Sequence, residues 1–258
     1  MHTHPAQFSS ARRAFTVMEL VVCIAILLIL GAIAVPVYNT MRTRANHTIA
    51  TNNLRQLGIS FSHFVSENDY ALPQEDAMGG DTWTAAADPI NAKIWYNALP
   101  KLSNTKGVGD YLGSASSFYH KDNILYLPGA KYPNGDSKLT APLFAIAMNS
   151  RLQRKDPLTG VKDPVLANKI AKPSRTVIFL ERGLKGEKAA TKAAPKYDGR
   201  PKANGRAFVE RYSGKGVLLF VDGHTESVQA DDIMDETARL LYPQTNIVWT
   251  ATGEDDPN

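Results

Sequence analysis

The chain has 258 residues, of which 43% are hydrophobic and 21% are charged, and this composition is close to that of an average globular protein. The net charge of +4 is small and no basic stripe carries interleaved aromatic residues, so nucleic-acid binding is not indicated. Cys23, which lies in an apolar run, is the only cysteine, so an intramolecular disulfide is excluded. The length suits one anchor and one head domain that folds on its own hydrophobic core.

The N-terminal region has the features of a targeting leader followed by a membrane helix. Residues 1–14 are polar and contain Arg12 and Arg13 but no acidic residue. Residues 20–37 follow as an uncharged apolar run, long enough to cross most of a bilayer core as a helix. Glu19 lies just before this run, and a carboxylate beside a membrane helix is costly unless it has a partner or a role.

Three interpretations compete for this region. A cleaved secretory signal peptide would use Ala32-Ile33-Ala34 as its cleavage site, but the apolar run is long for a signal peptide and Glu19 is badly placed. An uncleaved signal anchor explains the length and charge of the region, but it leaves Glu19 unexplained. The third interpretation rests on a resemblance to a known family.

Arg-Arg-Ala14, followed by Phe15-Thr16-Val17-Met18-Glu19-Leu20, resembles the prepilin processing site of type IV pilins and type II secretion pseudopilins. The resemblance implies that a prepilin peptidase cuts between Ala14 and Phe15, and that the new amine of Phe15 is methylated. It also implies that Glu19 pairs with the N-terminal amine of a neighbouring subunit and sets the axial register of a filament. The family usually has glycine where this chain has Ala14.

Helical periodicity continues beyond the apolar run and predicts one helix over residues 15–68, with its membrane-spanning part at about 15–37. Gly31 and Pro36 are the expected weak points, because proline removes a backbone donor and kinks a helix. Apolar residues at steps of three and four predict a face buried under the head: Leu54, Leu57, Phe61 and Phe64.

Two further segments resemble one bacterial subgroup of this family. Its members carry a segment like Asn53-Leu54-Arg55-Gln56-Leu57-Gly58, and they end in a motif of His, nine residues and Asp-Gly. Here the motif has Tyr212 at the His position, followed by Asp222-Gly223-His224. Asp222 and His224 suggest a metal or recognition site, and some pseudopilin heads hold calcium. Calcium needs six or more oxygens and this hairpin offers one clear carboxylate, so we expect a structural turn and no cofactor.

The head, residues 69–258, is predicted to consist of long loops and a few short elements. Asp222-Gly223 between two β-branched and aromatic runs is a strong hairpin signal. The sequence predicts strands at 123–127, 176–181, 216–221 and 224–228, a short apolar element at 94–99, an apolar run of ambiguous type at 141–150, a helix at 231–241 and a frayed end at 253–258.

Catalytic motifs are missing from the sequence. The head has no cysteine, no G-x-S-x-G, no H-E-x-x-H and no phosphate-binding loop. His120 has no acid in a helical or strand register to orient it. His47 and His63 are not at metal-ligand spacing and are expected to be solvated. We therefore expect no enzymatic activity.

The resemblance implies an α+β fold, with the long helix packed on a small antiparallel sheet. It implies a structural subunit of a type II secretion pseudopilus or type IV pilus-like filament, whose partners are the prepilin peptidase and other pilin-like subunits. Arg42 and Arg44 balance the leader charges, so the resemblance alone places the chain in the inner membrane with its head in the periplasm or outside. The alternatives are a membrane-anchored surface or adhesive protein that does not polymerise, and a secreted domain beginning after Ala34.

Overall fold

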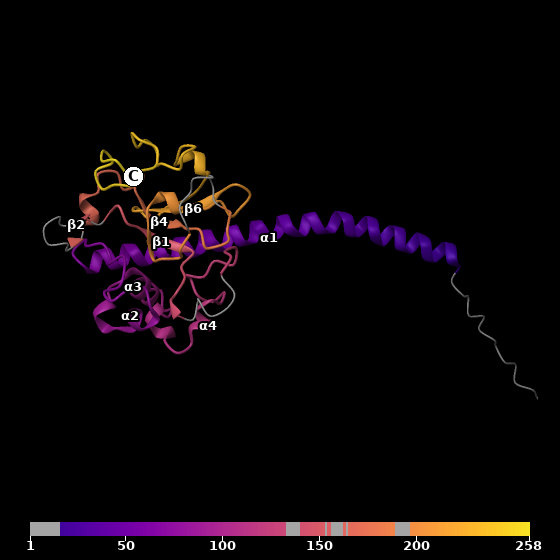
Figure 1. Cartoon of the computed structure of the whole chain (residues 1–258), viewed down its shortest axis with the longest axis horizontal. Helices are drawn as coiled ribbons and strands as arrows, with labels where there is room; N and C mark the ends of the chain where they lie inside the picture. The colour runs from indigo at the N-terminus through magenta and orange to yellow at the C-terminus, as the bar shows by residue number, and fades with distance from the viewer. Residues whose placement is uncertain (1–15, 133–139, 153, 156–161, 164, 189–196) are drawn as a thin grey trace, which may run out of the picture. The chain divides into compact units, whose positions relative to one another are not determined.

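The computed structural model describes residues 16–132, 140–152, 154–155, 162–163, 165–188 and 197–258 (Figure 1). The cleavage-site residues Ala14 and Phe15 lie outside this range. The chain divides into two compact units, Met1–Arg42 and Thr43–Asn258. Helix α1 (Val17–Glu67) belongs to both, and its 51 residues confirm the prediction of one continuous helix that ends near residue 68.

In the first unit, every described residue of α1 is exposed. The helix is long and apolar enough to cross a membrane, by length and composition. Gly31 and Pro36 do not interrupt it, although Pro36 lies inside the helix. The side-chain hydroxyl of Thr40 donates to the carbonyl oxygen of Pro36 at 3.0 Å. A kink at Pro36 stays a prediction.

The second unit, here called the head, contains the second half of α1, further short helices and a central sheet. Its other α-helices are α2 (Trp83–Ala87), α3 (Trp95–Leu102) and α4 (Ala115–Phe118), and its 3-10 helices are η1 (Pro89–Asn91), η2 (Val108–Tyr111), η3 (Ala167–Lys169), η4 (Gly205–Ala207) and η5 (Ala230–Asp232). Its strands are β1 (Ile146–Asn149), β2 (Arg154–Lys155), β3 (Lys162–Asp163), β4 (Val177–Glu181), β5 (Lys202–Ala203), β6 (Gly216–Phe220) and β7 (Thr225–Val228).

The central sheet has five strands in the order β5-β1-β4-β6-β7. Strands β1, β4, β6 and β7 pair antiparallel, as predicted, whereas β5 pairs parallel to β1, so the sheet is mixed. The pair β2 and β3 forms a separate two-stranded ribbon. The predicted hairpin is confirmed as β6 and β7, and the predicted strand at 176–181 is β4. The α+β layout with a long N-terminal helix is therefore the observed one.

Both faces of the sheet are buried at β6. Its side chains point alternately to the two faces, with the two-residue period of a strand, and each set packs into a hydrophobic core. Val217 and Leu219 face a core shared with α1 and α3, while Leu218 and Phe220 face a second core. The second core is closed by residues that follow the hairpin, among them Ile233, Leu240 and Trp249. Figure 1 shows α2, α3 and α4 on one side of the head and the C-terminal segment on the other.

Three predictions for the head are wrong. Residues 123–127 form a bend and a turn rather than a strand, because the Asn123 side chain bonds to nearby backbone, accepting from Leu125 N at 3.0 Å and donating to Phe118 O at 2.8 Å. In the predicted helix 231–241 only η5 is helical, since the Asp235 side chain accepts from the backbone nitrogens of Thr237 and Arg239 and so forms a turn.

The third concerns residues 253–258, which are not frayed. The side chain of Asn258 accepts from Leu240 N at 2.8 Å and donates to Leu240 O at 3.2 Å. The ambiguous run 141–150 contains β1, and the apolar element at 94–99 falls within the start of α3.

Candidate functional site

Glu19 begins α1 as part of a capping box. Thr16 N and Thr16 Oγ1 both donate to Glu19 Oε2, at 2.8 Å and 3.0 Å, and Glu19 N donates to Thr16 Oγ1 at 3.2 Å. A Thr three residues before a Glu satisfies two backbone donors that a helix N-terminus otherwise leaves free. The T-x-x-E spacing could have revealed this role in the sequence. Glu19 therefore has a hydrogen-bonding partner within its own chain.

A continuous apolar surface surrounds the helix after Glu19. Large hydrophobic side chains there are exposed by about half or more, and they include Leu20, Leu27, Leu28, Ile29 and Ile33. Apolar patches of this extent on a folded protein mark contact with lipid or with other protein chains. Gly31 lies on this surface with no atom within 4 Å of where a Cβ would be.

The Asp222-Gly223-His224 turn is held by its own residues. Asp222 Oδ1 accepts from His224 N at 3.1 Å and lies 2.6 Å from His224 Nδ1, while the imidazole stacks on Phe220 with ring centroids 4.3 Å apart. Gly223 has a positive φ of 90°, a conformation that glycine adopts without strain. These contacts support the expected structural turn.

The two segments that resemble the pilin subgroup meet in space. A Cβ on Gly58 of α1 would lie 2.9 Å from Leu219 Cδ1 and 3.2 Å from Gly223 O, so the hairpin packs directly on the backbone of the helix at this glycine. Beside it, Arg55 Nε donates to Thr225 Oγ1 at 3.3 Å. Both segments were singled out by their resemblance to the subgroup, but no sequence pattern predicted that they are in contact.

Tyr212 also contacts α1 within the head. Its ring lies 5.1 Å from the ring of His47, and His47 Nε2 lies 2.7 Å from Ser227 Oγ on β7. His47 is therefore a half-buried contact between α1 and the hairpin and is solvated only in part. His63 is exposed, as predicted, and lies 3.5 Å from Glu67 one helical turn later.

A buried ion cluster, defined here as Glu181, Glu187 and Arg211, lies beside Tyr212. Arg211 donates through Nε and Nη2 to the two carboxylate oxygens of Glu187, at 2.9 Å and 2.7 Å, and through Nη1 to Glu181 Oε2 at 2.9 Å. The three side chains are at most 5% exposed. Sequence reasoning missed this cluster; its one signal was an acid, Glu181, at the end of an apolar strand.

The cluster holds two carboxylates and one guanidinium. The Glu187 carboxylate accepts two hydrogen bonds from Arg211, and it also accepts from two backbone donors, Lys131 N and Leu184 N. Glu181 has one bond to Arg211, and its Oε1 is buried with no hydrogen-bond partner among the described residues. The Tyr212 hydroxyl is near enough to influence this carboxylate, but it does not reach hydrogen-bond geometry.

Among the three charged groups of the cluster, Glu181 therefore has the least compensation for the burial of its charge. Burial raises the pKa of Glu181 to about 7, although attraction to Arg211 opposes the shift. Burial acts to lower the pKa of Arg211, but the hydrogen bonds and negative charge of Glu187 and Glu181 raise it overall. Burial and the nearby Glu181 raise the pKa of Tyr212, so its phenol stays neutral.

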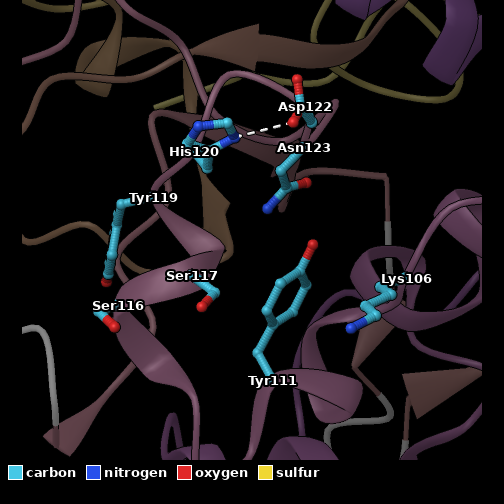
Figure 2. Close-up of a pocket in the computed structure, with 8 residues that line it drawn as sticks. All are labelled: Lys106, Tyr111, Ser116, Ser117, Tyr119, His120, Asp122 and Asn123. Atoms are coloured by element: carbon cyan, nitrogen blue, oxygen red, sulfur yellow. Dashed lines mark ion pairs between the residues drawn. The ribbon is translucent and has the colours of Figure 1, made fainter.

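A hollow of about 480 Å³ opens on another part of the head, around η2 and α4 (Figure 2). We call it the Tyr111 pocket, after the side chain whose hydroxyl points into it. One expectation is corrected here: His120 does have an orienting acid, since its Nδ1 lies 3.0 Å from Asp122 Oδ2. The two are brought together by a turn, which periodicity does not reveal. The remaining lining residues are Lys106, Ser116, Ser117, Tyr119 and Asn123.

No group of three or more His, Cys, Asp or Glu side chains in the described part of the chain could hold a metal ion. The absence of a cofactor stays a prediction. No family model, curated protein or solved structure matches the chain.

Proposed function

We propose that this chain is a structural subunit of a pilus-like filament, most closely of the type II secretion pseudopilin kind. The observation that carries the proposal is the first half of α1. It presents an exposed apolar surface, has Glu19 in its first turn, and follows the Arg12 to Phe15 processing signature. A prepilin peptidase would remove residues 1–14, and the apolar helices of several subunits would then leave the inner membrane and bundle together. The role is structural rather than catalytic.

The part played by Glu19 follows from the cost of charge in lipid. The Phe15 amine and the Glu19 carboxylate lie about one helical turn apart along the chain. Each charge is expensive in an apolar bundle unless it is paired. A neighbouring subunit shifted along the filament axis would bring its N-terminal amine to this carboxylate. The ion pair would then stabilise one axial register of the two subunits over all others.

The alternative, a membrane-anchored surface protein that does not polymerise, has one observation in its favour. The capping box already gives the Glu19 carboxylate two donors from Thr16. In that case the acid only begins the helix, and the apolar surface only contacts lipid.

Mass spectrometry of the mature chain tests processing. We expect a first residue of methylated Phe15. A chain that begins at Val35 would contradict the proposal and indicate a cleaved signal peptide, and an intact leader would favour the plain anchor.

Substitutions at the capping box then separate assembly from capping. Glu19→Gln keeps the size of the side chain but removes its charge, whereas Thr16→Val removes the cap but keeps the acid. We expect Glu19→Gln to insert into the membrane and to disappear from sheared, sedimented filaments, and Thr16→Val to remain in them. If both variants are lost from filaments, Glu19 acts only as a cap, and if both remain in them, its charge is not needed; either result contradicts the register argument.

A further inference from the structure

We propose that the Tyr111 pocket binds a saccharide residue that carries an acidic group. The site belongs to the folded head and does not depend on filament assembly. Its volume of about 480 Å³ falls within the range of small-molecule sites, roughly 300–1,000 Å³. Most such sites are apolar, whereas side chains with hydroxyl, amide, imidazole, carboxylate and ammonium groups line this one, so a hydrophilic ligand fits it better than an apolar cofactor.

Several polar groups at the pocket are unused by the protein itself. The hydroxyls of Tyr111, Ser116 and Ser117 form no hydrogen bond with the residues that the structure describes. Tyr111 itself is only 9% exposed, and its ring is fixed edge-to-face against Phe118 at 5.6 Å. In Figure 2 its hydroxyl points into the space between Asn123 and Lys106. A rigid aromatic ring with an unused hydroxyl offers an apolar surface and a hydrogen bond to the same ligand.

Lys106 is the ammonium group among the lining residues, and the nearby carboxylates contact other side chains. Asp122 is paired with His120 at 3.0 Å, and Asp110 is held by Lys101 at 3.4 Å and by Gly107 N at 2.9 Å. Lys106 has no carboxylate partner among the described residues and lies 5.7 Å from the centre of the Tyr111 ring. An ammonium beside a tyrosine ring and free hydroxyls can receive a carboxylate.

A sugar acid combines the required features in one ligand. Its hydroxyls match the hydroxyls of Ser116, Ser117 and Tyr111, its carboxylate matches Lys106, and the C–H face of its ring can lie against a tyrosine. Figure 2 shows Ser117 between Tyr111 and Tyr119 in this view, so this hydroxyl has a tyrosine ring on either side. Asn123 cannot contribute much, because its amide already bonds to Phe118 O and Leu125 N.

Calorimetric titration of the full chain in lipid nanodiscs tests the site, because nanodiscs avoid glycosidic detergents. The probes are tetragalacturonate, the neutral maltotetraose, and glutarate as an acid without a sugar ring. We expect tetragalacturonate to bind best. Lys106→Gln should weaken it about tenfold because it removes the positive charge, and Tyr111→Phe should weaken it severalfold because it removes the hydroxyl and keeps the ring. Lys215→Gln and Tyr70→Phe, at exposed positions away from the pocket, should leave it unchanged.

Binding of tetragalacturonate that both pocket variants weaken supports the site. Equal binding of maltotetraose would overturn the acidic specificity, and equal binding of glutarate would reduce the pocket to an anion site. No binding at millimolar concentration, or binding that survives both pocket variants, would overturn the proposal. None of these outcomes bears on filament assembly, which the Glu19 and Thr16 variants test separately.

Discussion

Arg211 is one cation between two buried carboxylates, and this imbalance decides the behaviour of the cluster. Glu187 satisfies the guanidinium in bidentate geometry, so Glu181 is the carboxylate whose ionised form is least compensated. A buried charge without full compensation costs several kcal/mol, and protonation removes that cost. Glu181 is therefore the residue through which the stability of the head should respond to pH.

The sign of this response follows from linkage. The folded-state pKa of about 7 exceeds the ordinary value of 4.5, so between these pH values the folded state binds more protons than the unfolded state. The contribution of Glu181 is fully present below about pH 4.5 and is lost as the pH rises through 7. The difference corresponds to roughly 3 kcal/mol. Urea unfolding followed by near-UV circular dichroism should show this loss in the wild type, and Glu181→Gln should flatten the profile.

Glu226→Gln, at an exposed position on β7, is the matched control and should keep the wild-type slope. An identical pH profile for wild type and Glu181→Gln would mean that Glu181 is ionised throughout and that Arg211 compensates both acids.

At the scale of elements, α1 and the β6-β7 hairpin are joined through close backbone approach rather than through large side chains. Gly58 lets Leu219 and Gly223 reach the helix, and His47 and Arg55 add polar contacts on either side. Each contact belongs to a residue of α1 and a residue more than a hundred positions later. The helix is thus an integral layer of the head and not only a stalk.

Gly58→Val should separate these two elements. A branched side chain would overlap Leu219 and the Gly223 carbonyl, and overpacking of this kind costs about 1–3 kcal/mol. Gly31→Val is the matched control in the same helix, because no atom lies within 4 Å of its Cβ position. We expect thermal unfolding of the head to shift only for Gly58→Val. An equal shift for both variants would indicate an effect on helix propensity instead of packing.

At the scale of the whole head, the C-terminal segment acts as the third layer. Trp249 is 1% exposed and packs in the second core, and its carbonyl accepts from the buried Asn149 side chain at 2.9 Å. The same Asn149 amide donates to Val177 O at 2.8 Å, so it ties the end of the chain to β4. Without this layer, Leu218, Phe220 and their neighbours would face water.

Trp249→Ala should therefore destabilise the head by about 3–5 kcal/mol, the usual cost of removing a buried tryptophan. Leu241→Ala, at a side chain 40% exposed, should change it by no more than about 0.5 kcal/mol. Chemical denaturation of both variants measures the difference. A small effect of Trp249→Ala would mean that the segment is an appendage rather than a layer.

The parts that the sequence predicted well are those with local signals. The hydrophobic period and its length predict the long helix, and the Asp-Gly pair between two apolar runs predicts the turn at Asp222-Gly223. The ion cluster, the Gly58 contact and the Tyr111 pocket each depend on residues far apart in the chain, and no local pattern encodes such proximity. The strand prediction for residues 123–127 was wrong because the Asn123 side chain accepts a hydrogen bond from the nearby Leu125 N. Such a local bond competes with strand pairing, even in a run whose side chains suit a strand.

The packing of β6 on α1 has a consequence for the order in which the protein is made. Gly58 leaves the ribosome early, whereas Leu219 and Gly223, which pack against it, come late in the chain. The covering of this helix face must therefore wait until almost the whole head has been synthesised. Contacts between such distant segments form slowly and leave apolar surface exposed meanwhile. We expect the nascent chain to need protection by a chaperone or by the membrane itself until the hairpin arrives.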